Sequence, residues 1–159
     1  MNIREAVAAD AERLIHVHYE SVHGTPARCY TPEIIDAWSR SPDEGRYQWM
    51  RQIISGVEHL VVVAEQKSDV LGFGIIIPGL GELRALYVHP RAGRKGVGTT
   101  LLGHLETRAT GLLLSVLRLR ASTNASSFYE RNGYRVLSTG TLQLSGELSM
   151  DCVNMEKRL

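Results

Sequence analysis

The chain has 159 residues, which is long enough for one domain with a sizeable core and too short for two domains of ordinary size. Hydrophobic residues make up 43% of it and charged residues 22%, a composition typical of globular rather than disordered proteins. The formal net charge is +1, which argues against a dedicated nucleic-acid-binding protein, because such domains are usually strongly basic. We therefore expect a single domain over residues 1–159.

Cysteine usage and the N-terminal segment bear on where the protein works. Cys29 and Cys152 lie far apart without a CxxC spacing, so neither a disulfide framework nor a zinc site is expected. The first residues are charged where a signal peptide needs an apolar core. No apolar run approaches the ~20 residues that a membrane-spanning helix requires. These features predict a soluble, cytoplasmic protein that binds no metal and no membrane.

The first half of the chain predicts one strand and three helices. Residues 2–7 read as a short strand, and Asp10 is placed to cap a helix whose apolar residues recur at helical spacing. A second helix is predicted after Thr31, because a cap residue, a proline and a glutamate follow one another there. A third helix is predicted over 47–54, ending near Gly56.

The second half is richer in β-branched residues and predicts mainly strands. Strands are expected at 60–65, 71–77, 82–89 and 112–121, with two more around a turn at Gly146. Helices are expected at 98–109, stopped by Gly111, and at 126–133. A strand, a helix and a strand follow one another between 82 and 121. Since such crossovers are right-handed, we expect these two strands to run parallel.

The segment HPRAGRKGVGTTLL (89–102) joins a predicted strand to a predicted helix. Free N–H groups at a helix start attract anions, and Gly96 and Gly98 allow the backbone to approach a ligand closely. The segment predicts binding of a phosphate or pyrophosphate; a glycine-rich turn with a solvated basic rim is the alternative. Its spacing fits neither a P-loop nor a dinucleotide-binding fingerprint. The basic residues suited to phosphates are Arg91, Arg94 and Lys95.

Three stretches together resemble the GCN5-related N-acetyltransferase (GNAT) family: LYVHPRAGRKGVGTTLL (86–102), FYERNGY (128–134) and MEKRL (155–159). The order of elements also matches that fold across nearly the whole chain. The resemblance implies an α/β (α+β) fold with a central twisted sheet, mixed but mostly antiparallel, of six to seven strands and about four helices. It implies an enzyme that uses acetyl-CoA as acyl donor, needs no metal ion and acetylates an amine.

In this family a [QR]xxGx[GA] loop binds the pyrophosphate of acetyl-CoA. GRKGVG (93–98) has both glycines but carries Gly93 where a side-chain donor is usual, so Arg94 or Lys95 is expected to substitute. The strand before the loop pairs with the pantetheine arm, and an amide at or near Val88 polarises the thioester carbonyl as an oxyanion hole does. The resemblance implies donor contacts from Leu86, Tyr87, Val88, Arg94, Lys95, Gly96, Val97, Gly98, Thr99, Ser122, Ala125 and Phe128.

A second family motif, NxxAxx[FL]Y, corresponds to residues 122–129. Ser122 stands in place of the asparagine and the other motif positions match, whereas Asn124 lies two residues away and does not inherit the role. Tyr129 occupies the position of the general acid that protonates the leaving CoA thiolate. A phenol can do this, because its pKa is about 10, whereas that of a thiol is roughly 8.5. The alternative is an aromatic residue that only packs against the sheet.

The general base is less clearly indicated. Glu82 lies at the start of its strand, where many relatives place an acidic base, but a glutamate facing solvent at a strand end is an equal alternative. Three histidines on or just after the first helix border the acceptor side in this fold, and each is more simply structural than catalytic: His16, His18 and His23.

The segment CYTPEIIDAW (29–38) is similar to a YSPEQxxAW-like stretch of a bacterial, small-molecule-type subgroup of the family. Its aromatic residues Tyr30 and Trp38, with Trp49, offer a flat apolar surface to an acceptor, although Trp38 is also suited to anchoring its helix on the sheet. Cys29 lacks an identifiable base and is not expected to be a nucleophile. The acceptor is expected to be a small-molecule amine or a peptide, and a homodimer, common among relatives, is left open.

The expected reaction is direct attack of a primary amine on the thioester in a ternary complex, where orientation contributes ~7–11 kcal/mol. The alternative is a CoA-binding regulatory or structural module, which would keep the glycine loop but lack a working acid and base. Nucleic-acid binding through the basic loop residues is disfavoured by the net charge of +1.

Overall fold

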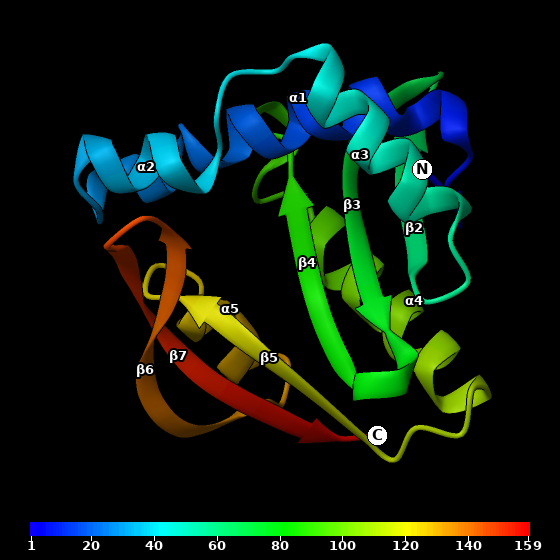
Figure 1. The fold of residues 1–159 in the computed structure, drawn as a ribbon. Coiled ribbons are helices and arrows are strands. Elements are labelled where there is room, and N and C mark those ends of the chain that lie inside the picture. The colour runs from blue at the N-terminus through cyan, green and yellow to red at the C-terminus, as the bar shows by residue number, and fades with distance from the viewer.

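The computed structural model describes residues 1–159 and contains one seven-stranded sheet in the order β1-β2-β3-β4-β5-β7-β6 (Figure 1). Neighbouring strands are antiparallel except β4 and β5, which are parallel, as predicted. The strands are β1 (Asn2–Glu5), β2 (Leu60–Gln66), β3 (Asp69–Ile77), β4 (Glu82–Val88), β5 (Val116–Ser122), β6 (Arg135–Ser145) and β7 (Leu148–Arg158). The helices are α1 (Ala11–Val22), α2 (Pro32–Trp38), α3 (Glu44–Ser55), α4 (Val97–Gly111) and α5 (Ser126–Arg131). This confirms the predicted α+β fold.

Helices cover both faces of the central strands. Helices α1 and α3 pack on one face and α4 on the other (Figure 1). Along β2, Val61 and Val63 point toward α1 and α3, while Val62 and Ala64 point toward α4. Because both faces of this strand are buried, its sequence is a continuous apolar run rather than an alternating one.

Strands β4 and β5 meet at a single pair, Glu82 with Arg118, and then diverge (Figure 1). A bulge lies close to this point, because Arg84 is an extra residue of β4 between the positions paired with Ile75 and Ile76. A bulge bends its strand and increases the local twist, which turns β4 away from β5. The sheet is therefore open along the carboxyl-terminal parts of two strands that are adjacent in its order.

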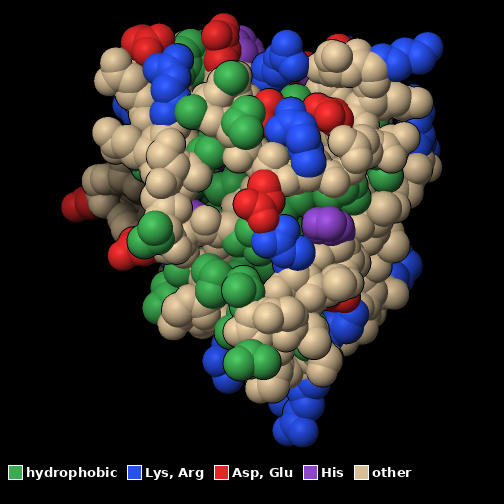
Figure 2. Space-filling view, turned by 90° about the vertical axis from the view of Figure 1, so that its right-hand side faces the viewer, with side chains coloured by type: hydrophobic (Ala, Val, Ile, Leu, Met, Phe, Trp, Pro, Cys, Tyr) green, Lys and Arg blue, Asp and Glu red, His purple; other side chains and the backbone are tan.

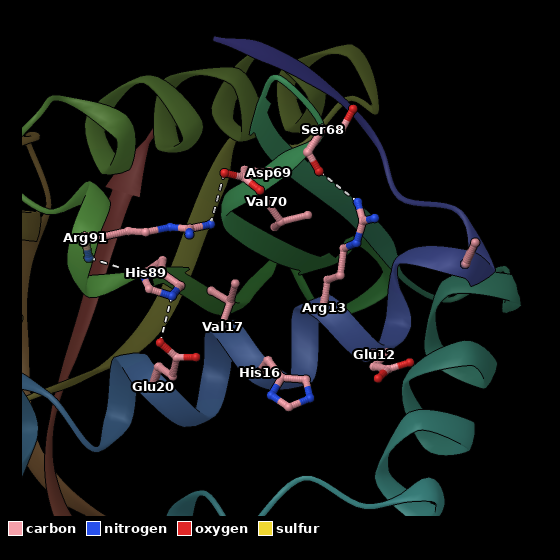
Figure 3. Close-up of a pocket in the computed structure, with 11 residues that line it drawn as sticks. Glu12, Arg13, His16, Val17, Glu20, Ser68, Asp69, Val70, His89 and Arg91 are labelled. Atoms are coloured by element: carbon pink, nitrogen blue, oxygen red, sulfur yellow. Dashed lines mark hydrogen bonds and ion pairs between the residues drawn. The ribbon is translucent and has the colours of Figure 1, made fainter.

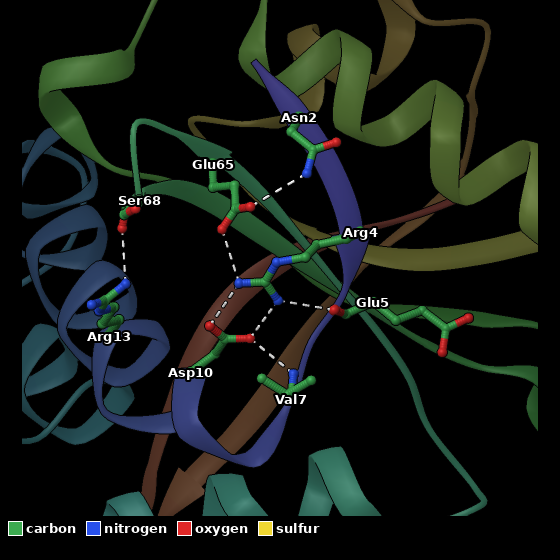
Figure 4. Close-up of polar contacts among 8 residues, drawn as sticks. All are labelled: Asn2, Arg4, Glu5, Val7, Asp10, Arg13, Glu65 and Ser68. Carbon is green, nitrogen blue, oxygen red and sulfur yellow. Dashed lines mark hydrogen bonds and ion pairs between the residues drawn. The ribbon is translucent and has the colours of Figure 1, made fainter.

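Asp10 has a different role from the predicted one. Its carboxylate makes no capping hydrogen bond to α1. It accepts hydrogen bonds from the Val7 N–H (2.8 Å) and from Arg4 (2.7 Å), whose guanidinium also pairs with Glu65 (2.9 Å; Figure 4). The Arg4 hydrogen bond holds the pKa of Asp10 below its usual value. This half-buried cluster ties β1 both to the start of α1 and to β2.

The strand predicted at 112–121 begins later in the structure, at Val116. Helix α4 extends to Gly111, and the left-handed residue of the following turn is Leu113 (φ 64°), not the glycine. Leu113 is 92% exposed, so this apolar run turns the chain at the surface instead of entering the core. Apolar character alone could not separate these residues from the strand. The first strand also ends early, at Glu5 rather than residue 7.

Two helix starts follow the capping chemistry of their sequences. Thr31 accepts a hydrogen bond from the Ile34 N–H (3.4 Å), as predicted for α2. Helix α3 starts at Glu44, earlier than predicted, because the Asp43 carboxylate accepts from the Arg46 N–H (2.8 Å).

The side of the molecule that carries α3 and the N-terminal strand has a mixed surface. Figure 2 shows basic and acidic side chains lying next to one another there, with hydrophobic side chains in a broken band between them. No helix of the chain is both long enough and apolar enough to span a membrane.

Candidate active site

The divergence of β4 and β5 produces a cleft of about 1160 Å³. The two strands, the start of α4 and helix α5 form its walls, and the segment between α1 and α2 borders it. The structure brings together most residues predicted to bind the donor. Those that line the cleft are Leu86, Tyr87, Val88, Arg94, Gly96, Val97, Gly98, Thr99, Ser122, Ala125 and Phe128. Tyr129, the predicted general acid, lines it as well.

Part of the β4 backbone faces this cleft without a strand partner. The His89 N–H donates to the Leu71 carbonyl of β3 (2.8 Å), which fixes the alternation of hydrogen bonds along β4. By that alternation, the main-chain groups of Leu86 and Val88 point away from β3, toward the side on which β5 has diverged. An extended ligand can therefore pair with this edge as an added strand does.

The start of α4 is shaped for an anion. Gly96 has φ 79° and precedes the first helical residue, and Arg94 also has positive φ (59°), which is uncommon for a residue with a side chain. A Cβ on Gly98 would lie 3.4 Å from the Phe128 ring, so the glycine keeps the space beside the helix start open. The free amides of a helix start and the Arg94 side chain together suit a phosphate group.

Lys95 lies outside this arrangement. Its ammonium group donates to the Arg91 carbonyl (2.9 Å), and it is not among the residues that line the cleft. Of the two residues expected to replace the side-chain donor missing at Gly93, only Arg94 lines the cleft. Lys95 instead links two parts of the loop before α4 through its hydrogen bond to Arg91.

Tyr129 projects from α5 into the cleft lining, although only 8% of the residue is exposed. Its ring packs edge-to-face against Phe128 (5.1 Å between centroids) and Tyr134 (5.5 Å), which fix its orientation. Its hydroxyl forms no hydrogen bond within the chain. Burial raises the pKa of Tyr129, so the hydroxyl stays protonated and remains a proton donor.

An aromatic row joins the far side of the cleft to the sheet. The Trp38 indole donates to the Tyr87 hydroxyl (3.1 Å), and the Trp38 ring meets Tyr30 edge-on at 5.9 Å. The Tyr30 hydroxyl donates to the Asp151 carbonyl (2.7 Å) and accepts from the Thr123 N–H (2.8 Å). This row fixes α2 over the C-terminal strands. Trp49, the third predicted aromatic residue, lies on α3 outside the cleft and is 52% exposed.

Glu82, the predicted acidic base, does not line the cleft. Its carboxylate is 2.7 Å from the Arg84 guanidinium and 4.0 Å from that of Arg120. The single ladder pair with Arg118 places it at the closed end, where β4 and β5 meet. The Glu82 carboxylate is therefore engaged with arginine side chains at that end and is not directed at a ligand in the cleft.

The three histidines are separated by the fold. The Nδ1 atom of His18 lies 2.9 Å from the guanidinium of Arg46, which can only donate, so this nitrogen carries no proton. Burial, and then the charge of Arg46, lower the pKa of His18 to about 3. His23 lines the cleft and its Nε2 donates to the Ser39 carbonyl (2.9 Å). His16 faces a second hollow and contacts the Tyr47 hydroxyl (3.0 Å).

That second hollow, of about 700 Å³, lies on the other side of α1 (Figure 3). Two pairs of its polar side chains contact one another: Glu20 is 2.7 Å from His89, and Asp69 is 3.6 Å from Arg91. Arg91, one of the three basic loop residues, therefore points away from the cleft. No group of three or more His, Cys, Asp or Glu side chains in the chain is arranged to hold a metal ion.

The structure adds cleft residues that the motifs did not indicate. Asn124 lines the cleft with its side-chain oxygen buried and without a hydrogen-bond partner, although it lies off the family motif position. Four further arginines join Arg94 in the lining. They are Arg28, Arg84, Arg120 and Arg131. The alternation of arginine with apolar residues in RLRA (118–121) was a sequence signal that one face of this strand is polar.

Comparison with known proteins places this geometry in a family. Residues 57–136 match the family model described as the acetyltransferase (GNAT) domain, a range that holds β4, the glycine loop, α4 and Tyr129. The chain belongs to the GNAT acetyltransferase family. Its donor substrate is acetyl-CoA and its reaction is N-acetyl transfer, which favours the enzyme over the non-catalytic CoA-binding module.

Two GNAT relatives are named for different acceptors. The chain is 32% identical to a spermidine N(1)-acetyltransferase of Thermoplasma acidophilum over 87% of this chain and 91% of that one. It is 28% identical to the peptidyl-lysine N-acetyltransferase YiaC of Escherichia coli over 69% of this chain and 80% of that one.

Solved structures agree on the GNAT fold. A GCN5-related N-acetyltransferase of Rhodopseudomonas palustris superposes with a TM-score of 0.90 at 28% identity, covering 99% of this chain and 95% of that one. The PaiA N-acetyltransferase of Thermoplasma acidophilum, solved in complex with coenzyme A, has a TM-score of 0.78 at 27% identity, covering 99% and 98%.

Proposed function

We propose that residues 1–159 act as one catalytic domain that transfers an acetyl group from acetyl-CoA to a primary amine by direct attack in a ternary complex. The observation that carries this proposal is the open edge of β4, which faces Tyr129 across one cleft. The donor is expected to lie along Leu86–Val88, with its pyrophosphate at the amides following Arg94. The exposed Cys29 and buried Cys152 are both free thiols, which fits the reducing cytoplasm as the place of reaction.

In this mechanism different groups in the cleft stabilise the oxyanion, donate the proton and position the substrates. A main-chain N–H at or near Val88 stabilises the oxyanion that develops on the thioester carbonyl. Tyr129 then donates its proton to the departing CoA thiolate, for which its raised pKa keeps the proton available. The aromatic row of Tyr30, Trp38 and Tyr87 forms a rigid wall beside the reacting groups.

Attack requires the acceptor amine to be neutral, whereas a free alkylamine with pKa about 10.4 is mostly protonated at neutral pH. The residues that line the cleft include five arginines and no carboxylate. Nearby positive charge disfavours the protonated amine, so the cleft itself lowers the pKa of the bound acceptor. We therefore assign Glu82 the role of holding Arg84 in place rather than that of a base.

Substitution of Tyr129 by phenylalanine tests the assignment of the acid. Tyr129→Phe keeps the packing against Phe128 and Tyr134 but removes the proton donor. We expect kcat to fall by about 10²–10⁴-fold, the range for general acid catalysis, with acetyl-CoA binding preserved. The measurement is CoA-thiol release over an amine panel, alongside calorimetric titration with acetyl-CoA. Tyr134→Phe is the matched control, since Tyr134 does not line the cleft. Unchanged turnover in Tyr129→Phe would show that Tyr129 is not the general acid.

A further inference from the structure

Four of the five arginines in the cleft lining occupy two different ends of it, and the fifth, Arg28, lies in the segment between α1 and α2. Arg94 and Arg131 belong to the loop before α4 and to the end of α5, beside the amides assigned to the donor pyrophosphate. Arg84 and Arg120 lie at the opposite end, next to the point where β4 and β5 meet. The phosphates of the donor account for the first pair and leave the second pair without a ligand.

The second pair stands on a polar surface of the sheet. On β5, Leu117 and Leu119 are buried against α4, so the residues that alternate with them point to the opposite face. Arg120 is one of these, and its approach to Glu82 places the glutamate on the same face. Arg84 contacts the same carboxylate. This is the face on which α1, α2 and α3 lie (Figure 1), away from α4.

Positive charge is in excess on this surface. The carboxylates that its arginines approach are Glu82 and Glu156, and Glu156 is already held by Arg118 (3.4 Å) and Arg135. With Arg84 and Arg120, four guanidinium groups face two carboxylates, which leaves two positive charges uncompensated. The surface is therefore prepared for an anion and repels a cation.

Arg120 is the group best placed to bind that anion. It lines the cleft, its side chain is 43% exposed, and its guanidinium makes no hydrogen bond within the chain. The nearest carboxylate oxygen, from Glu82, is 4.0 Å away, beyond hydrogen-bonding distance. Its fork of N–H donors matches the two oxygens of a carboxylate.

We propose that the acetyl acceptor is a small amine that also carries a carboxylate group, and that Arg120, assisted by Arg84, binds this carboxylate. The inference rests on the proposed N-acetyl transfer and adds the substrate class. A carboxylate near the amino group offsets the repulsion that the arginine-rich cleft exerts on a cationic amine. A polyamine such as spermidine has no such group, and no carboxylate lines the cleft to bind its positive charges.

The test compares acceptors with and without a carboxylate. CoA-thiol release is measured with acetyl-CoA and with pairs of α-amino acids and their carboxamides, and with spermidine and putrescine. The expected kcat/KM is at least about tenfold higher for the acid than for its amide, because a charge-assisted hydrogen bond is lost in the amide. Arg120→Gln is expected to remove this preference by raising the acceptor KM, with the KM for acetyl-CoA unchanged.

Arg118→Gln is the matched control. It is on the same strand and face as Arg120 but does not line the cleft, and Glu156 retains Arg135 when Arg118 is replaced. We expect this variant to keep the wild-type preference for acids. Arg120→Lys, which keeps the charge and loses the planar fork, should show an intermediate preference.

The outcomes separate this proposal from the proposed function. Equal use of acids and amides, or a preference for spermidine, would overturn the carboxylate proposal and leave N-acetyl transfer intact. A rise in the KM for acetyl-CoA in Arg120→Gln, with the acid preference unchanged, would assign Arg120 to the donor instead. Calorimetric binding of acetyl-CoA without thiol release on any acceptor would contradict both proposals.

Discussion

His18 and Tyr129 are polar groups that the fold keeps in their neutral forms. Removal from water disfavours any charged form, so it lowers the pKa of the imidazole to about 3 and raises that of the phenol. The neutral forms of the two residues serve different purposes. Tyr129 keeps a proton that it can donate into the cleft, whereas His18 keeps an unprotonated Nδ1 that accepts from Arg46 and joins α1 to α3.

The neutral state of His18 predicts a pH dependence of stability. Its folded pKa of about 3 lies below the unfolded value of about 6.5, so the unfolded chain binds more protons between these values. The stability it contributes is present above about pH 6.5 and is lost as the pH falls toward 3, with a slope of at most about 1.4 kcal/mol per pH unit. Chemical denaturation of the wild type and of His18→Asn between pH 7 and 5 should show a flatter dependence in the variant.

The exposed His16 on the same helix provides the control. His16→Asn should keep the wild-type dependence, because its ring is not part of the Arg46 cluster. Parallel curves for the wild type and His18→Asn would show that His18 is not the group responsible.

For single residues, the sequence predicted which positions carry the motifs, but not which charged side chains lie next to them. Tyr129 and the loop glycines follow from local sequence patterns, and the structure brings them to one cleft. Glu82 carried the expected residue type, but its arginine partners come from a bulge and from a different strand. Such neighbours depend on strand register between distant segments, which single-sequence reading does not supply.

Among the elements, β3 and α4 use glycine for opposite reasons. Gly72 on β3 leaves no space for a side chain, because an added Cβ would lie 2.7 Å from the Tyr87 carbonyl oxygen. Gly103 on α4 is exposed and meets nothing within 4 Å. The first glycine therefore permits the close approach of β3 and β4, whereas the second only loosens a helix.

This contrast predicts substitutions of opposite sign. Gly103→Ala should raise the free energy of unfolding by about 0.5–1 kcal/mol, because alanine favours the helix and restricts the unfolded chain. Gly72→Ala should lower it by about 1–3 kcal/mol, because the strands must move apart to admit the methyl group. Urea denaturation of both variants measures the difference. Stabilisation by Gly72→Ala would mean that the two strands adjust without cost.

Element order and most boundaries could be predicted because capping residues and β-branched runs act locally. The exception is the run 112–121, where three leucines and Ser115 precede β5 and do not belong to it. Periodicity cannot distinguish a buried strand from an adjoining apolar turn. The exposed left-handed Leu113 has no sequence marker, since that conformation is usually held by glycine.

For the whole molecule, β4 and β5 are joined by a single ladder pair, so a donor that binds in the cleft as proposed would also link the two parts of the sheet. A ligand that bridges the cleft binds only the folded state and stabilises it by about 2.7 kcal/mol at a concentration 100 times its Kd. For a chain of this size we expect acetyl-CoA to raise Tm by about 5–10 °C at that concentration. Thermal unfolding with and without acetyl-CoA measures the shift.

Two glycine variants, one just before α4 and one within it, make this measurement more specific. Gly96→Ala should reduce the shift, because a side chain strains the left-handed turn that presents the amides. Gly103→Ala lies outside the cleft lining and should keep the full shift. An equal shift in both variants would place the donor away from the start of α4.

The split between β4 and β5 also has a consequence for solubility. Unpaired strand edges act as templates for other chains, and here two such edges lie within the sheet when no ligand is bound. Charged side chains beside an edge oppose this pairing, and Arg84 and Arg120 stand where the two edges begin. The guanidinium groups that select the acceptor therefore also protect the empty enzyme from aggregating through its own active site.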